Sequence, residues 1–252
     1  MRAKLLIGML ILGLGWSQPA ASGSVLLYDG FEGYPTGYEL NEPPWHRYRY
    51  DGDAHATVVE APYTGDKSVH FDDPGPRPHE IVLGRSFPAN SEPTTIEYYM
   101  KTASSSDEGA RIGIQGDAGH DSCATFSNGA FGGAAGYIGV WGPLSGWREP
   151  RLLSYLVDQW YYFRRTLDYA ANTETFYVEE LVNEPGHPGN RSASYKWVGL
   201  DYRGTYVDEV LMSTSGSQGA DCYVDGLRIT PEPAALTLLA LGAAAAILRR
   251  RS

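Results

Sequence analysis

The chain is short of cysteine and of positive charge. Its two cysteines stand far apart and have no C-x-x-C or H-x-x-x-H spacing beside them, which argues against a zinc site. The 20 basic residues face 30 acidic ones, a formal net charge of −10 at pH 7. Because a negative field repels phosphate groups and anionic lipid, this balance argues against nucleic-acid binding and peripheral membrane docking. Neutral glycans or cations suit the chain better.

Familiar sequence signatures of enzymes are missing as well. The chain has no G-x-S-x-G nucleophile elbow, and its glycine-rich segment 128–140 lacks the spacing and the following helix of a dinucleotide-binding loop. The six histidines are scattered through segments that resemble loops. These absences leave no residue with a clear catalytic role.

The central part also lacks an amphipathic helical period. Short alternating or apolar runs are separated instead by clusters of Gly, Pro, Asn and Asp, as in β-strands. The run TTIEYYMK places Ile96, Tyr98 and Met100 on one face, and 18 tyrosines add to the β signal. Strands are predicted at residues 24–29, 68–71, 80–87, 94–101, 110–116, 136–141, 160–169, 173–182, 205–213 and 222–230. The sequence therefore predicts one all-β sandwich domain over residues 23–230.

Both terminal segments differ from this body. Arg2 and Lys4 precede an apolar stretch, Leu5–Trp16, and a run of small residues follows it, the pattern of a signal peptide over residues 1–22. Near the other end, Pro231-Glu232-Pro233 precedes an apolar run at residues 234–248. That run would be about 22 Å long as a helix, short for a hydrocarbon core of roughly 30 Å. The sequence therefore predicts export and a short C-terminal transmembrane helix.

Three arginines, Arg249, Arg250 and Arg251, follow the apolar run, where the positive-inside rule places them in the cytoplasm. The order of Pro231-Glu232-Pro233, apolar run and arginine cluster resembles the PEP-CTERM sorting signal of Gram-negative envelope proteins. The resemblance covers residues 231–252. It implies recognition and removal by an exosortase, and residence in the envelope, on the outer surface or in the extracellular matrix. Without both terminal segments the basic count falls from 20 to 15 and the acidic count from 30 to 29, a net charge of −14.

Cys123 and Cys222 both lie in the part predicted to be exported, where a disulfide is permitted. A bond between them would close a loop of about 100 residues and contribute up to roughly 4 to 5 kcal/mol in the chain-entropy model. The alternative is two unpaired thiols, because sequence does not show whether the two Cα atoms come within reach.

Three motifs of the body resemble concanavalin A-like jelly rolls, which include LamG-type modules and laminarinase-like glycosidases. These are LLYDGFEGYPTG near the start, DQWYYFRRTLDYAANTETFYVEE in the middle and YVDGLRIT near residue 230. The resemblance implies that the first and last strands lie together, and that Asp29 or Glu32 with Asp225 holds a structural calcium ion. Strand alternation independently places Asp225 on the face of Leu227 and Ile229, where a buried carboxylate needs a cation, an arginine or backbone donors.

The glycosidase signature of that family is absent. Laminarinase-like catalysis needs Glu-x-Asp-x-x-Glu on one strand, and the nearest approach is the run from Glu179 to Glu184, with Leu181 in the place of the aspartate. Strand alternation also sends Glu179 and Glu184 to opposite faces. The sequence therefore favours a protein without catalytic activity.

Aromatic residues in turn-rich segments are the candidates for stacking on sugar rings. They are Trp45 and Tyr48 in PPWHRYRY, and Trp141 and Trp147 in WGPLSGW, the alternative being ordinary packing at the ends of the sandwich. Trp160 and Trp197 are expected in the strand core. The sequence thus predicts an exported, surface-sorted protein that binds a polysaccharide or builds the matrix. The alternative is a divergent polysaccharide lyase or glycoside hydrolase of the concanavalin A-like superfamily.

Overall fold

The computed structural model describes residues 24–51, 53–74, 80–117, 119–120, 123–127, 129, 133–142, 146–182, 190–199, 204–214 and 219–232. All regular elements in these ranges are strands, so the predicted all-β class is confirmed. Within the same ranges, no helix has the length and apolarity to cross a bilayer. The predicted signal peptide and the predicted transmembrane segment fall outside the described residues.

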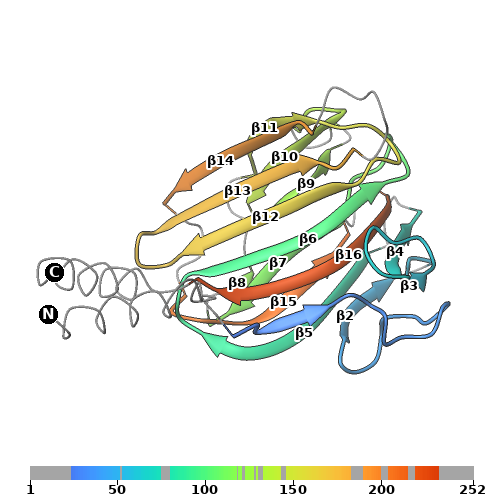
Figure 1. Cartoon of the computed structure of the whole chain (residues 1–252), viewed down its shortest axis with the longest axis horizontal. Coiled ribbons are helices and arrows are strands. Elements are labelled where there is room, and N and C mark those ends of the chain that lie inside the picture. The colour runs from blue at the N-terminus through green and yellow to red at the C-terminus, as the bar shows by residue number, and fades with distance from the viewer. Residues whose placement is uncertain are drawn as a thin grey trace, which may run out of the picture.

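One layer of the sandwich is an eight-stranded antiparallel sheet in the order β14-β13-β12-β6-β16-β4-β3, with β1 paired to β16 (Figure 1). Its strands are β1 (Leu27–Asp29), β3 (His55–Val59), β4 (Ser68–Asp73), β6 (Thr94–Thr102), β12 (Tyr161–Asp168), β13 (Thr173–Glu180), β14 (Ser192–Val198) and β16 (Ala220–Pro231). The first and last strands lie side by side, which confirms what the jelly-roll resemblance implied.

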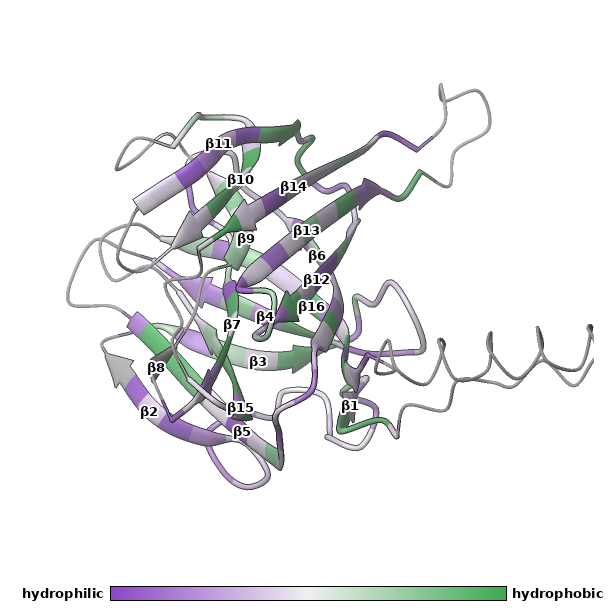
Figure 2. Cartoon of the chain, turned by 90° about the vertical axis from the view of Figure 1, so that its left-hand side faces the viewer, coloured by the Kyte–Doolittle hydropathy of each residue, from purple (hydrophilic) through white to green (hydrophobic). Residues whose placement is uncertain are grey.

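The other layer consists of two smaller sheets that meet where β7 contacts β9. The five-stranded sheet has the order β2-β5-β15-β7-β8, and the three-stranded sheet has the order β11-β10-β9. Their strands are β2 (His46–Asp51), β5 (Glu80–Asn90), β7 (Arg111–Gly116), β8 (Gly119–His120), β9 (Cys123–Ser127), β10 (Tyr137–Gly142), β11 (Gly146–Ser154) and β15 (Val207–Ser213). Figure 2 shows this layer facing the eight-stranded sheet, with polar and apolar residues alternating along many of the strands.

The core lies between the two layers and is built by strand alternation. On β6 the buried residues are Ile96, Tyr98 and Met100, as the alternation in TTIEYYMK predicted. Tyr98 stacks on Phe163 of β12, with ring centroids 5.0 Å apart. Phe126 of β9 meets Phe163 edge to face at 5.9 Å, so aromatic packing joins the two layers.

All ten predicted strands are present, but six further strands were missed, among them β2, β11 and β14. The segment PPWHRYRY was predicted to be irregular, and this is wrong from His46 onward. Strands β2 and β14 end the order of their sheets, and in β14 only Trp197 is buried. An edge strand covered on one side carries few apolar residues, so its sequence pattern is weak.

A bulge in β16 corrects the predicted face of Asp225. Asp225 pairs with Tyr99 and Arg228 with Glu97, so three steps along β16 match two steps along β6. Gly226 accommodates the extra residue with a φ of 58°, in the left-handed region. Asp225 therefore shares the outer face of the sheet with Tyr99, while Leu227 points into the core.

The last described residues extend this sheet. Pro231 ends β16 and pairs with Thr94, and the Glu232 amide donates to the Pro93 carbonyl at 2.6 Å. The Thr95 hydroxyl donates to the Glu232 carboxylate. The first two residues of the Pro-Glu-Pro triplet are thus attached to the sheet, and Pro233 lies outside the described residues.

The predicted disulfide is not formed in the structure, where Cys123 and Cys222 are both free and buried. They belong to different layers: Cys123 begins β9, and Cys222 lies in β16. The Cys222 sulfur accepts a hydrogen bond from the Ala110 amide at 3.1 Å instead. Of the two alternatives, the structure has the unpaired thiols.

Candidate functional site

A pocket of about 240 Å³ opens on the outer face of the second layer, where the five-stranded and three-stranded sheets meet. It is lined by Tyr48, Glu80, Val82, Arg111, Gly113, Gln115, Cys123, Trp141, Leu211, Ser213 and Thr214. Alternation explains the floor, because Arg111, Gly113 and Gln115 are every second residue of β7. The intervening Ile112 and Ile114 are fully buried in the core.

One wall of the pocket is formed by Tyr48, which belongs to a cluster of three polar side chains. Glu209 on β15 is 6% exposed and accepts hydrogen bonds from the Tyr48 hydroxyl at 2.9 and 3.1 Å. The His46 ring lies 2.6 Å from the same carboxylate, and its edge faces the Tyr48 ring at 4.9 Å. Burial, and next the hydrogen bond to Glu209, raise the pKa of Tyr48, so its phenol stays protonated at neutral pH.

The cluster lies flat on β5 because residue 84 is glycine. Gly84 pairs directly with His46 across the sheet. A Cβ atom at this position would come 2.6 Å from the Tyr48 ring and 2.9 Å from the His46 ring. A side chain here would displace the wall of the pocket.

The opposite wall is built from Trp141 of β10 and Arg111 of β7. The Arg111 guanidinium lies over the Trp141 ring at 4.6 Å and donates to the buried Glu108 carboxylate at 2.7 Å. Such stacking fixes both planar groups and leaves the ring half-exposed at the pocket. The pocket therefore joins one aromatic ring from each of two sheets.

Few of the remaining lining groups ionise. Among the described lining residues, Glu80 is the only carboxylate, and it pairs with Arg49 at 2.6 Å. Burial raises the pKa of the Cys123 thiol to about 12, so the thiol is not a nucleophile at neutral pH. The described pocket lacks the pair of carboxylates that glycoside hydrolysis uses.

The structure brings together two of the four predicted aromatic residues. Tyr48 and Trp141 line the same pocket from different sheets. Trp147 pairs with Trp141 across the β10–β11 hairpin, and its half-buried ring covers Gly139. Trp45 is fully buried and donates its indole N–H to Asp29 at 2.8 Å, so its predicted role in stacking on sugars is wrong.

The two tryptophans predicted for the strand core behave differently. Trp197 of β14 is 5% exposed and belongs to the core, as predicted. Trp160 precedes β12 and is half-exposed, with the Lys101 ammonium 5.5 Å above its ring, so its core assignment is wrong.

The carboxylates predicted to bind calcium are held by protein donors. Asp29 accepts hydrogen bonds from the Phe31 amide and the Trp45 indole, both at 2.8 Å, and forms an ion pair with Arg85. It lies on the core side of the sheet, whereas Asp225 lies on the outer side. The bulge at Gly226 places Asp225 and Asp29, which the jelly-roll resemblance implied to lie together, on opposite faces of the sheet.

Asp225 and Glu32 instead hold one loop, residues 63–67. The Asp225 carboxylate accepts from the amides of Tyr63 at 3.0 Å and Thr64 at 2.7 Å. Glu32 accepts from the amides of Asp66 at 2.8 Å and Lys67 at 3.1 Å. Within the described part of the chain, no group of three or more His, Cys, Asp or Glu is placed to hold a metal ion.

Sequence reasoning missed Arg111, Gln115, His46 and Glu209. Alternation in the predicted strand RIGIQG does place Arg111 and Gln115 on one face, so that signal was available. The meeting of His46 with Glu209, two strands apart in the sheet, has no sequence signal, because the order of strands cannot be read from a single chain.

The fold has known counterparts, although no family model and no curated protein matches the chain. The catalytic domain of a GH131 β-glucanase from Podospora anserina is similar over 84% of this chain and 97% of its own, with 14% identity and a TM-score of 0.55. Lectin UEA-II, complexed with galactose, is similar over 83% of this chain and 100% of its own, with 8% identity and a TM-score of 0.51.

A sialidase is similar over 75% of this chain, with 12% identity and a TM-score of 0.50, but only 17% of the sialidase is covered. At such identities the likeness shows the fold alone. The body is a jelly-roll β-sandwich of the concanavalin A-like type, the architecture of these lectins and glycoside hydrolases.

Proposed function

We propose that the protein binds carbohydrate in the pocket between the five-stranded and three-stranded sheets, without catalysing a reaction. The observation that carries the proposal is the convergence of Tyr48 and Trp141 from separate sheets on one pocket that also contains Arg111 and Gln115. Aromatic faces suit the apolar side of a sugar ring, while fixed donors and acceptors suit its hydroxyl groups.

The polar groups of the pocket are pre-organised for this role. Arg111 is stacked on Trp141, and the Tyr48 hydroxyl is fixed on Glu209, so little side-chain freedom is lost when a sugar binds. A formal net charge of −10 disfavours acidic glycans, so we propose a neutral polysaccharide as the ligand.

Affinity electrophoresis in gels containing neutral polysaccharides tests the proposal. The wild-type chain should be retarded, and Trp141→Ala should weaken the affinity about tenfold if stacking contributes about 1.4 kcal/mol. Trp197→Phe, a change in the core away from the pocket, is the control. Equal retardation of wild type and a variant carrying both Tyr48→Ala and Trp141→Ala would contradict a pocket that binds sugar.

A divergent polysaccharide lyase or glycoside hydrolase is the second candidate, favoured by the cluster of His46, Glu209 and Tyr48. A protonated phenol fixed by a histidine–carboxylate pair could donate a proton to a leaving group. Release of soluble or unsaturated products from a polysaccharide panel separates the two functions. A binding protein is retarded and releases nothing, whereas a lyase loses product formation in Tyr48→Phe.

We also propose that the protein is exported and sorted to the cell surface by an exosortase-type enzyme. The proposal is supported by the sequence pattern of residues 1–22 and 231–252 alone. Replacing Pro231-Glu232-Pro233 by alanines should leave export intact and block processing of the tail. Mass spectrometry of the envelope fraction checks this, and an intact tail in the wild-type protein of a host with an active exosortase would oppose it.

A further inference from the structure

A second polar surface lies on the outer face of the eight-stranded sheet, the face opposite the pocket. It contains a groove of about 470 Å³, whose lining includes Tyr63, Glu97, Tyr99, Tyr162, Glu179 and Arg228. We call this surface the tyrosine groove. The side chains come from β6, β12, β13 and β16, with Tyr63 from the loop before β4.

Cross-strand pairing arranges the groove in two rows. One row runs Glu179, Tyr162, Tyr99 across β13, β12 and β6. The other runs along Tyr177, Arg164, Glu97, Arg228 and Tyr28. Directly paired residues share a face of the sheet, so tyrosines lie next to charged groups of both signs.

The tyrosines form a continuous strip of rings. Ring centroids are 4.5 Å apart for Tyr63 and Tyr99, 5.6 Å for Tyr99 and Tyr162, and 6.3 Å for Tyr162 and Tyr177. Trp160 extends the strip beyond Tyr63, at 6.0 Å. These residues are half-exposed, although a sheet face in contact with water ordinarily carries small polar and charged side chains.

The carboxylates of the groove are fixed by the same rings. The Tyr162 hydroxyl donates to Glu97, and the Tyr177 hydroxyl donates to Glu179 at 2.9 Å. Burial raises the pKa of Tyr99 and of Tyr162, so both phenols remain donors at neutral pH. Each carboxylate keeps acceptor sites beyond the bond it makes to a tyrosine.

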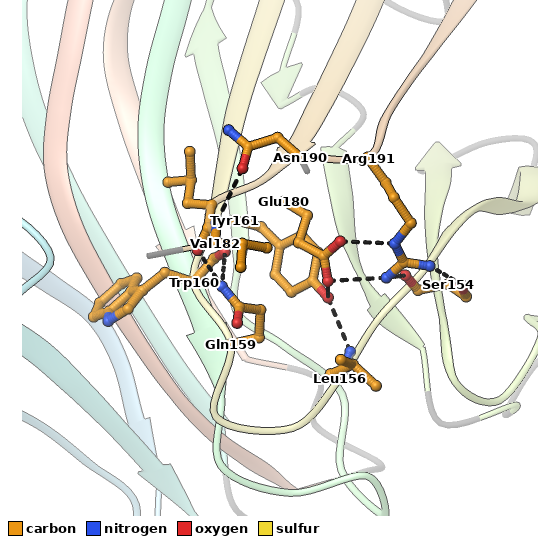
Figure 3. A network of polar contacts seen from close by, with 10 residues as sticks. Ser154, Leu156, Gln159, Trp160, Tyr161, Glu180, Val182, Asn190 and Arg191 are labelled. Carbon is orange, nitrogen blue, oxygen red and sulfur yellow. Dashed lines mark hydrogen bonds and ion pairs between the residues drawn. The ribbon is translucent and has the colours of Figure 1, made fainter. Parts of the chain in front are cut away.

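A buried network holds the end of β13 beside the groove (Figure 3). Glu180, fully buried, accepts from Arg191 at 2.7 and 3.0 Å, and Arg191 donates to Ser154 of β11. Asn190 next to Arg191 donates to Glu179 at 3.0 Å, so the network also fixes a groove carboxylate.

The loop that carries Tyr63 is anchored by its backbone. Asp225 holds the Tyr63 and Thr64 amides from beneath, and Glu32 holds two amides further along the loop. These bonds do not involve the Tyr63 side chain. Its ring is therefore presented by a fixed loop and can be replaced without removing the anchors.

We infer that the tyrosine groove is a second binding site, for one chain of a neutral polysaccharide. The half-exposed rings, tilted or edge to face toward one another, offer apolar surface to the flat faces of successive sugar residues. The fixed carboxylates and phenols between them fit hydroxyl groups. With the pocket on the opposite face, one molecule can hold two chains and cross-link them.

The charge and polarity of the groove select this occupant. Glu97 and Glu179 outnumber Arg228 among the charged lining residues, so the groove would repel a phosphate or carboxylate polymer. The formal net charge of −10 adds to that repulsion. An apolar helix or strand would bury the same two carboxylates without new donors, which is costly. A chain rich in hydroxyl groups supplies donors to the carboxylates and an apolar ring face to the tyrosines.

The test compares four full-length proteins in gels that contain galactomannan, xyloglucan or mixed-linkage β-glucan. They are the wild type, a pocket variant with Tyr48→Ala and Trp141→Ala, the groove variant Tyr63→Ala, and the combination of all three changes. The groove variant should lose about tenfold in affinity and the pocket variant at least as much, and the combination of all three changes should lose most of the binding that remains. Only the wild type should cross-link, seen as increased viscosity of the polysaccharide solution.

Conservative variants show whether a loss of binding comes from the changed side chain or from misfolding. Tyr63→Phe keeps the ring and should bind as the wild type does, whereas Glu97→Gln keeps the shape and should weaken binding. Melting temperatures confirm that all variants are folded.

The outcomes distinguish the two sites. If the groove variant binds as tightly as the wild type, and the combination binds as tightly as the pocket variant, the groove proposal is overturned and the pocket proposal stands. Loss of binding through Tyr63→Ala with no effect of the pocket variant supports the groove and overturns the pocket. A wild type retarded by none of the three polysaccharides counts against both sites.

Discussion

The pocket and the tyrosine groove lie on opposite faces of one sandwich and are assembled in different ways. The pocket needs two sheets, because Tyr48 comes from β2 and Trp141 from β10. The groove takes its two rows from adjacent strands of a single sheet, where pairing sets each neighbour. The residues of a site on one face of a single sheet follow from strand alternation and strand pairing. The residues of a site between two sheets depend on how the two sheets pack.

The stabilising contacts of the two faces differ in burial. Behind the groove, Glu180 is fully buried and forms an ion pair with Arg191. At the rim of the pocket, Arg49 and Glu80 form an ion pair whose arginine side chain is 54% exposed. A buried charge without its partner is costly, while an exposed pair contributes little.

Removal of Arg191 should therefore have the largest effect on stability. Arg191→Ala removes the cation paired with a buried carboxylate and should lower the free energy of unfolding by about 3 kcal/mol. Arg49→Ala, the matched change at the pocket, should lower it by less than about 1 kcal/mol. Urea unfolding of both variants measures the difference. Equal costs would show that burial does not distinguish the two faces.

A glycine lies under each site and gives a matched pair of substitutions. At Gly84 a Cβ would come 2.6 Å from the Tyr48 ring, so Gly84→Ala should cost about 1 to 3 kcal/mol and weaken binding in the pocket. At Gly226 a Cβ would come 2.9 Å from the Tyr99 ring, and the φ of 58° adds strain. Gly226→Ala should cost at least as much and weaken binding in the groove.

Gly37→Ala is the control for the glycine pair. Gly37 has a φ of 84° and no atom within 4 Å of an added Cβ, so it isolates the cost of backbone strain. Thermal unfolding and gel retardation should show a loss of stability without loss of binding. If Gly226→Ala costs no more than Gly37→Ala, the contact with Tyr99 contributes nothing.

Much of the fold and part of the groove were accessible from sequence. Alternation in TTIEYYMK placed Glu97 and Tyr99 together on the face opposite Ile96, and the structure confirms this arrangement. Tyrosines indicate β-strands wherever they occur, so their number alone does not predict that they form a row of rings on the water-facing side of the sheet.

Other features could not be read from the chain. The bulge at Gly226 reverses the face of Asp225, and a single sequence with one glycine in a strand does not fix where a bulge falls. The exposed β2 lacked apolar alternation, so Trp45 was placed in an irregular segment, although it packs in the core beside Asp29. Pairing between strands distant in the sequence decided these points.

The carboxylate beneath the groove should make stability depend on pH. Burial raises the pKa of Asp225 above its ordinary value of 3.8, against the opposing effect of hydrogen bonds from Thr64 and Tyr63. The folded state therefore takes up a proton at a higher pH than the unfolded state. Protonation of Asp225 thus contributes to the free energy of unfolding, and this contribution is complete below about pH 4. It is lost as the pH rises through the raised pKa.

Asp225→Asn removes that titration. Its stability relative to the wild type should rise with pH from about 4 to 7, measured by urea unfolding at several pH values. Gly37→Ala, which removes no ionisable group, should show a constant difference. If the stability difference between Asp225→Asn and the wild type were also constant with pH, Asp225 would titrate alike in the folded and unfolded states.

The thiols should respond weakly to reagents. Burial raises the pKa of both Cys123 and Cys222 to about 12, and both are free. Iodoacetamide at pH 8 should leave the folded protein unlabelled and label two sites after unfolding without reductant. One or no labelled site would instead indicate a disulfide, and a reductant would then lower the melting temperature.

Chelation of calcium should have the smallest effect on stability. It tests Asp29, Glu32 and Asp225, the carboxylates predicted to bind calcium. Asp29, Glu32 and Asp225 each accept at least two protein donors, so we expect a chelator to move the melting temperature by less than about 1 °C. A bound calcium ion would instead stabilise the fold by about 2.7 kcal/mol at a hundredfold excess over its dissociation constant, and its removal would lower the melting temperature by several degrees. Differential scanning calorimetry of chelator-treated protein, with and without added calcium, measures this. A loss that calcium restores and Asp225→Asn abolishes would place the ion at the Asp225 carboxylate oxygen Oδ1, which is buried and has no partner among the described residues.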